Sequence, residues 1–103
     1  MRLENYPKEK LKKEILEIVG EHLDLNEYEV FFFGSRVSGK GDERSDIDVG
    51  IEGKEPVPFS TISAVQEKLE ELPVLYKIDV VDFTGADENF KSVAKKDIEL
   101  LTK

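Results

Sequence analysis

Two short strand-like segments, joined by a glycine-containing polar stretch, constrain this chain more than any other feature. Residues 28–33 (YEVFFF) combine aromatic and β-branched side chains, which is typical of a buried strand, and Gly34 ends the run. Residues 46–52 (DIDVGIE) alternate between apolar and acidic or small side chains, the period of a half-buried strand. Between them, residues 34–45 contain three glycines among polar residues and predict a loop or a single helical turn. The fold must therefore contain a sheet.

Helical periodicity surrounds these strands. Apolar residues recur at three- to four-residue spacing in three segments: residues 8 to about 23, residues 60 or 61 to 72, and residues 90–101. Residues 76–83 predict a third strand. Helices that alternate with a few strands predict an α/β (α+β) fold, in which a small mixed sheet of at least three strands has helices packed against it. We expect a single domain over residues 1–103, since no repeat or domain boundary interrupts the chain.

Composition excludes several classes of function. The chain has no cysteine, so a disulfide framework, a thiolate zinc site and thiol catalysis are all impossible. With 23 acidic against 15 basic residues the net charge is −8, and the field of the protein should repel a polyanion, so we expect no non-specific nucleic-acid binding. The amino-terminal residues contain no uninterrupted apolar run of signal-peptide length. No segment of the chain approaches the ~18 consecutive apolar residues of a membrane span. We therefore expect a cytoplasmic protein without membrane contact.

An acidic pair begins the second predicted strand. Asp46 and Asp48 are two residues apart, so their side chains should emerge on one face with their Cα atoms ~6.6 Å apart. Both could bind one Mg²⁺, which prefers oxygen ligands and completes its shell with water and substrate phosphate. Such a pair alone is expected by chance among 23 acidic residues, so the prediction depends on its neighbours.

A third carboxylate on a neighbouring strand would allow a site with two metal ions, one at the attacking oxygen and one at the leaving group. The predicted third strand offers Asp79 and Asp82, which point to opposite faces. Ile78 and Val80 share the face of Asp82, and we expect these apolar residues to face the helices. Parity therefore favours Asp79, although Val81 shares its face.

The turn after the first strand is suited to a phosphate. Gly34 permits a tight turn and close approach of the backbone, while the Ser35 hydroxyl and the N–H groups that follow can bind phosphate oxygens. Arg36 could add positive charge. We predict that the nucleotide-binding residues are Gly34, Ser35, Arg36 and Ser45.

Two competing motifs fit less well. Residues 34–40 match the first seven positions of a Walker A loop, but Gly41 stands where a Ser or Thr must bind Mg²⁺, and a strand follows instead of a long helix. An EF-hand loop counted from Asp46 fails at its twelfth position, which is Val57.

These residues resemble a known family. The pattern apolar-Gly-Ser, ten residues, Asp-apolar-Asp-apolar resembles the signature of the DNA polymerase beta-like nucleotidyltransferase superfamily, and the run FGSRVSGKGDERSDIDVGIE is similar to the minimal nucleotidyltransferases, or MNT proteins. The similarity extends over most of the chain from Val30 onward. It implies an Mg²⁺-dependent, two-metal transfer of NMP from an NTP, with ATP as the favoured substrate. It also implies that Asp46, Asp48 and Asp79 are the catalytic metal ligands and that Gly34 and Ser35 hold the triphosphate.

The resemblance also implies a partner. Such minimal proteins are often paired with a HEPN-domain protein as a toxin and antitoxin couple, in which the nucleotidyltransferase is the antitoxin and adenylylates a tyrosine of the toxin. The expected partners are thus a nucleoside triphosphate and a HEPN-domain protein, in a homo- or hetero-oligomer. One departure from the family pattern is that Val37-Ser38-Gly39 replaces the Ala-Arg-Gly of many relatives, which leaves one arginine fewer for the phosphates. Lys40 could restore the charge, without the bidentate geometry of an arginine.

Two alternatives stay open at this point. The chain could be a non-catalytic nucleotide-binding or partner-binding module that neutralises its partner by complex formation alone. Transfer to a small molecule is less favoured, because no region of so short a chain looks able to enclose one unless a dimer supplies the wall.

Overall fold

The computed structural model describes residue 3, residues 6–38 and residues 46–102, and over these it forms one mixed sheet with helices on both faces. The elements in chain order are α1 (Lys8–Gly20), β1 (Tyr28–Phe33), α2 (Ser35–Ser38), β2 (Ile47–Gly53), α3 (Phe59–Glu70), β3 (Ile78–Asp82), α4 (Glu88–Ala94) and β4 (Glu99–Leu100). The strand order is β3-β2-β1-β4, in which β2 is antiparallel to β1 and parallel to β3, and β4 is antiparallel to β1. The predicted fold class is confirmed. In the described residues, no helix is long and apolar enough to cross a membrane.

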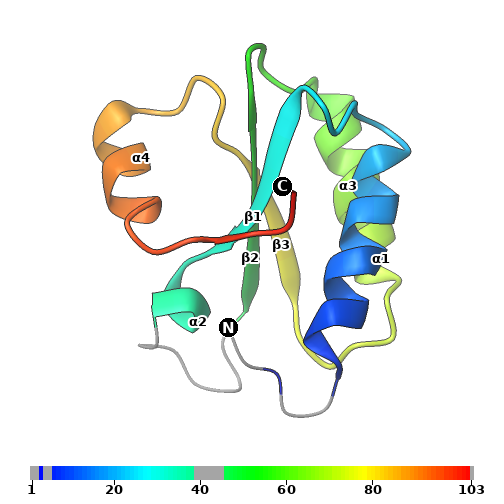
Figure 1. Ribbon diagram of the computed structural model, residues 1–103. Coiled ribbons are helices and arrows are strands. Elements are labelled where there is room, and N and C mark those ends of the chain that lie inside the picture. The colour runs from blue at the N-terminus through cyan, green and yellow to red at the C-terminus, as the bar shows by residue number, and fades with distance from the viewer. Residues whose placement is uncertain (1–2, 4–5, 39–45, 103) are drawn as a thin grey trace.

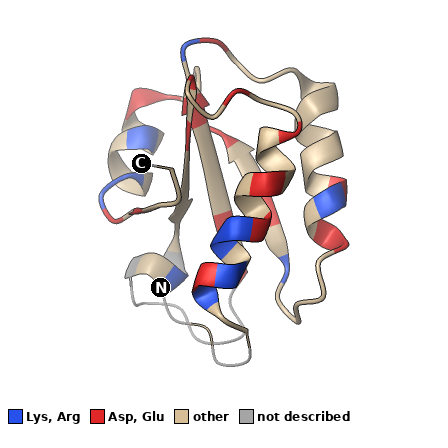
Figure 2. Cartoon of the chain, turned by 45° about the vertical axis from the view of Figure 1, so that its right-hand side comes forward, with Lys and Arg blue, Asp and Glu red and all other residues tan. Residues whose placement is uncertain are grey.

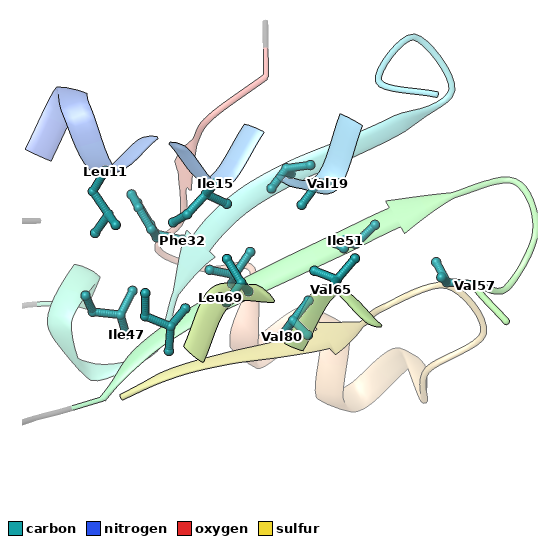
Figure 3. Packing of buried hydrophobic residues seen from close by; sticks show 13 residues of the cluster. Leu11, Ile15, Val19, Phe32, Ile47, Ile51, Val57, Val65, Leu69 and Val80 are labelled. Atoms are coloured by element: carbon teal, nitrogen blue, oxygen red, sulfur yellow. The ribbon is translucent and has the colours of Figure 1, made fainter. Parts of the chain in front are cut away.

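The main core lies between the sheet and the helix pair α1 and α3, which cover the same face (Figure 1). On α1, Leu11, Ile15 and Val19 are four residues apart and fully buried, because this spacing places them on one side of the helix. They point toward Phe32 of β1, while Val65 and Leu69 of α3 approach β2 and β3 (Figure 3). The outer side of α1 carries interspersed basic and acidic residues (Figure 2).

The opposite face of the sheet carries a second, smaller core. Phe31 and Phe33 of β1 meet Phe83 edge to face, with ring centroids 5.0 and 4.9 Å from that of Phe83. The helix α4 packs here, and its Lys91 and the adjoining Lys95 form ion pairs with Glu52 of β2. All three phenylalanines of β1 are buried, as expected, but successive rings lie on opposite faces of the sheet.

The prediction of a helix over residues 90–101 is wrong in its second half. Asp87 caps α4 by accepting hydrogen bonds from the N–H groups of Asn89 and Phe90, and the helix already ends at Ala94. The chain then pairs with the exposed edge of β1, where Leu101 N donates to the Val30 oxygen over 2.8 Å. The apolar residues that suggested a helix instead pack against the sheet, since tertiary pairing outweighs local periodicity.

The outer edge of β3 is blocked by a side chain. Gln66 of α3 donates from Nε2 to the Ile78 oxygen over 2.7 Å, and its Oε1 accepts from Val80 N over 2.9 Å. One side-chain amide thus takes the place of a peptide group from a neighbouring strand. This arrangement covers backbone groups that an edge strand would otherwise offer to another chain.

A charged cluster fastens β4 to α1. Glu99 lies 3.0 Å from Lys12 Nζ and 3.2 Å from Lys8 Nζ. Burial opposes ionisation of Glu99, but hydrogen bonds from charged amino groups, including those of Lys12 and Lys8, outweigh it and lower the pKa to about 2. The ionised carboxylate is therefore favoured by folding.

We expect this cluster to make stability depend on pH in the acid range. Because folding lowers the pKa of Glu99 from 4.5 to about 2, its contribution is complete above the higher value and is lost as the pH falls toward the lower one. Glu99→Gln should reduce the free energy of unfolding by about 1–2 kcal/mol at pH 7, and by clearly less at pH 3. Urea denaturation of both proteins at the two pH values measures this difference. A constant difference would contradict the assignment.

Candidate active site

Three strands bring the predicted site residues to one end of the sheet. Phe33 at the end of β1 is the register partner of Asp48 in β2, and Asp48 is in turn the partner of Asp79 in β3. The neighbours Ile47 and Ile78 are buried in the main core, so the two aspartates point to the opposite face of the sheet. Asp79, as strand parity indicated, therefore lies beside Asp48.

Asp82 has a different place. Its Oδ2 accepts a hydrogen bond from Val57 N over 2.8 Å, and its Oδ1 accepts one from Thr84 N over 2.9 Å. Both bonds hold loops at the far end of β3. Asp82 therefore stabilises these loops and is not part of the acidic pair.

Asp46 lies one residue before β2 and is exposed. The adjoining backbone is tied to β3, because Ile47 N donates to the Lys77 oxygen over 2.8 Å. The ammonium group of Lys77 lies 3.9 Å from Asp79 Oδ1, although the lysine side chain is 65% exposed. No role for Lys77 was predicted, yet its spacing of two residues from Asp79 within the predicted strand over residues 76–83 is a signal that the sequence carries.

The carboxylates influence one another electrostatically. Burial raises the pKa of Asp48 above its usual range, and the negative charges of Asp79 and Asp46 raise it further. A cation between these groups would relieve the repulsion.

The turn after β1 is packed directly against Asp48. Gly34 has φ +88°, a region that residues with a side chain rarely adopt, and a Cβ atom there would lie 2.3 Å from Asp48 Oδ2. The four-residue helix α2 follows, so the described part of the segment predicted as a loop or a single helical turn is a helical turn. Gly34 is thus required both by its backbone conformation and by the carboxylate beside it.

Two of the predicted nucleotide-binding residues are not seen in full. The side chain of Ser35 and the whole of Ser45 lie outside the described residues, as does Lys40. Arg36 is described. It is only 9% exposed, and its guanidinium carbon lies 4.6 Å from the centre of the Tyr76 ring.

The donor set suits a magnesium ion. In the described part of the chain no three acidic or histidine side chains already converge as a metal cluster. Mg²⁺ usually takes only one or two carboxylates and fills its remaining positions with water and substrate phosphate. Adjacent carboxylates at Asp48 and Asp79, with Asp46 nearby, offer the hard oxygen donors that such a half-site needs.

The fold and the acidic face together define a class of protein. The crystal structure of a candidate nucleotidyltransferase from Sulfolobus solfataricus superposes with a TM-score of 0.57 at 32% identity, covering 89% of this chain and 77% of that one. Residues 13–103 match the family described as Polymerase beta, Nucleotidyltransferase. The chain belongs to this family and is a nucleotidyltransferase.

Further comparisons narrow the relationship within the family. The chain is similar to Probable protein adenylyltransferase MntA of Haemophilus influenzae, with 33% identity over 88 residues, which are 84% of this chain and 77% of that protein. A toxin-antitoxin crystal structure with AMP-PNP superposes with a TM-score of 0.67 at 16% identity, covering 87% of this chain and 71% of the other. A structure of a tri-AMPylated HEPN toxin from Shewanella oneidensis in complex with MNT antitoxin superposes with a TM-score of 0.70 at 15% identity. It covers 92% of this chain and 71% of the other. At such low identity, the last two show a common fold.

Proposed function

We propose that this nucleotidyltransferase is an Mg²⁺-dependent protein adenylyltransferase that transfers AMP from ATP to a tyrosine hydroxyl of a HEPN-type toxin and acts as its antitoxin. The observation that carries the proposal is the register of Asp48 and Asp79 beside the Gly34 turn. The 33% identity to a protein named as an adenylyltransferase supports AMP as the transferred group. The fold shared with MNT antitoxin complexes supports the class of partner.

In this proposal the turn and the acidic face share the binding of ATP. Backbone N–H groups after Gly34 would hold the triphosphate, as would Ser35, Arg36 and Ser45. Asp46, Asp48 and Asp79 would hold Mg²⁺, as a pair of ions in the full two-metal arrangement. When bound, the metal would neutralise phosphate oxygens and steady the leaving pyrophosphate.

The transfer exchanges one bond to phosphorus for another. The tyrosine oxygen forms a bond to the α-phosphorus, the bond from this phosphorus to the bridging oxygen breaks, pyrophosphate leaves, and the phenol loses its proton. Among the described elements, α1 and α3 cover the other face of the sheet, and α4 packs near Glu52 at the opposite end of β2. As far as the described elements go, the end of the sheet at Asp48 is thus not covered by α1, α3 or α4, and an acceptor carried by another chain could approach there.

Labelling with ATP tests the proposal. The protein is incubated with Mg²⁺, ATP labelled at the α-phosphate and a HEPN-domain protein encoded beside it, and the label on the HEPN-domain protein is measured. Asp79→Asn should lose transfer, while Asp97→Asn, which changes an exposed acid in the turn after α4, should match the wild type. Equal labelling by the wild type and the Asp79→Asn protein would refute the assignment.

The same variants test the alternative that the chain is a non-catalytic binding module. A metal-site variant that still protects cells from the partner, without labelling it, would show neutralisation by complex formation alone. Loss of protection together with loss of labelling would support the enzyme.

A further inference from the structure

The Arg36 guanidinium lies against an aromatic ring. Its central carbon is 4.6 Å from the centroid of Tyr76, within the distance of a cation–π interaction. Arg36 is 9% exposed, and within the described part of the chain it is the one charged residue that is buried. Because burial removes water from this contact, the stack is stronger than the same pair would be on the surface.

The stack joins the two halves of the proposed site. Arg36 belongs to α2 and comes two residues after Gly34, which itself is packed against Asp48. Tyr76 lies two residues before β3 and three residues before Asp79. The turn proposed to hold phosphate is thus held at one point by the Asp48 carboxylate and at a second point by a ring on the segment that leads into the strand of Asp79.

The ring face of Tyr76, and not its hydroxyl, makes this contact. The Tyr76 hydroxyl oxygen is buried and has no hydrogen-bond partner within the described residues. The ring also packs against the main core. A phenylalanine would keep both contacts, whereas an aliphatic residue would keep only the packing. A guanidinium is planar and stacks on a ring in a way that the ammonium group of a lysine does not reproduce.

We propose that Tyr76 is a positioning residue, which acts through Arg36 to fix the phosphate-binding turn relative to Asp79. This inference rests on the proposed function, because it assumes that the turn binds ATP. In this role Tyr76 would act on the turn and would not itself bind phosphate or metal. It sets where the turn lies when the nucleotide arrives.

Binding of AMP-PNP in the presence of Mg²⁺, measured by calorimetry, tests the inference. Tyr76→Phe should bind within about twofold of the wild type, whereas Tyr76→Leu should bind about tenfold more weakly, the scale of a desolvated cation–π contact. In an Arg36→Lys background the change of Tyr76 to Leu should add little, because the stack is already lost. Val74→Ala is the control, since Val74 comes two residues before Tyr76 and is also a partly buried apolar residue that packs against the main core.

Five outcomes separate the proposed function from the role of Tyr76. A wild-type protein that does not bind AMP-PNP would refute the proposed function itself. If the wild type binds, equal affinity of Tyr76→Leu would overturn the role of Tyr76. The role of Tyr76 would also be overturned if Tyr76→Leu weakened AMP-PNP binding equally in the wild-type and Arg36→Lys backgrounds. The same holds if Val74→Ala weakened binding as much as Tyr76→Leu, because either result would mean that the effect does not pass through the stack. The predicted pattern, with rescue by phenylalanine, supports it.

Discussion

Asp48→Asn is expected to abolish nucleotide transfer and, at the same time, to make the metal-free protein more stable. The activity should fall by more than about 100-fold, because a metal ion supplies several kcal/mol of charge stabilisation and each ~1.36 kcal/mol is tenfold in rate. The gain in stability follows from the burial of a charge and from the like charges around it. Asp48 is half-buried beside Asp79, and its pKa is raised by burial and by its acidic neighbours, so its ionised form is disfavoured in the folded state.

The asparagine keeps the shape of the side chain and removes its charge. The stability of the variant in EDTA should exceed that of the wild type by up to about 1 kcal/mol, the scale of a like-charge pair on neighbouring strands. With Mg²⁺ and AMP-PNP the order should reverse, since only the wild type gains the free energy of binding. Thermal denaturation of both proteins under both conditions measures this reversal in the order of stability.

The matched control is again Asp97→Asn, which removes an exposed acid elsewhere. It should be active and should respond to Mg²⁺ and AMP-PNP as the wild type does. An Asp48→Asn protein that is less stable than the wild type in EDTA would show that the carboxylate has a structural role. Retained transfer would exclude Asp48 from the metal site.

Much of the fold was predictable because it is encoded locally. The buried strand at residues 28–33 has the expected bounds, and the alternation in β2 placed Asp48 on the face away from the helices α1 and α3. Parity favoured Asp79 over Asp82, because Ile78 and Val80 were expected to face the core, but Val81 on the face of Asp79 left the choice open until the structure placed Asp79 beside Asp48. These are consequences of the two-residue period of a strand.

Features that depend on distant parts of the chain were not predictable. The short strand β4 forms because it pairs with the free edge of β1. No periodicity in the sequence near Glu99 predicts a strand there. The stack of Arg36 on Tyr76 joins residues 40 positions apart (76 − 36), and a single sequence contains nothing that pairs them. The metal and nucleotide roles of the site residues stay predictions, which the substitutions at Asp48, Asp79 and Gly34 test.

Gly34→Ala should also abolish transfer, but for a steric reason. The new Cβ would lie 2.3 Å from Asp48 Oδ2, so the carboxylate has to rotate away from the position beside Asp79. The alanine must also adopt φ near +88°, which costs about 1–2 kcal/mol. A displaced carboxylate should reduce the rate by more than about 100-fold, as removal of the ligand does.

Alanine substitutions at two other glycines separate backbone strain from steric clash. Gly85 has nearly the same backbone angle, φ +81°, but the atom nearest to an added Cβ would be Pro56 Cγ, at 4.0 Å. Gly85→Ala should therefore lose about 1–2 kcal/mol of stability and keep full activity. Gly50→Ala would bring its Cβ within 2.3 Å of the buried Phe31 ring, and should cost about 1–3 kcal/mol or more through overpacking.

Comparison of the three alanine variants isolates the role of Gly34. Urea denaturation gives the stability of each, and the rate of labelling per folded molecule gives its activity. We expect the activity to fall only in Gly34→Ala, although Gly50→Ala should lose at least as much stability. If Gly34→Ala and Gly85→Ala were equally active, the contact between the turn and Asp48 would have no part in catalysis. If all three lost activity in proportion to stability, a general weakening of the fold would explain the loss. Only a selective effect at Gly34 requires the close approach of the turn to the acidic pair, because backbone strain is matched at Gly85 and a steric clash is matched at Gly50.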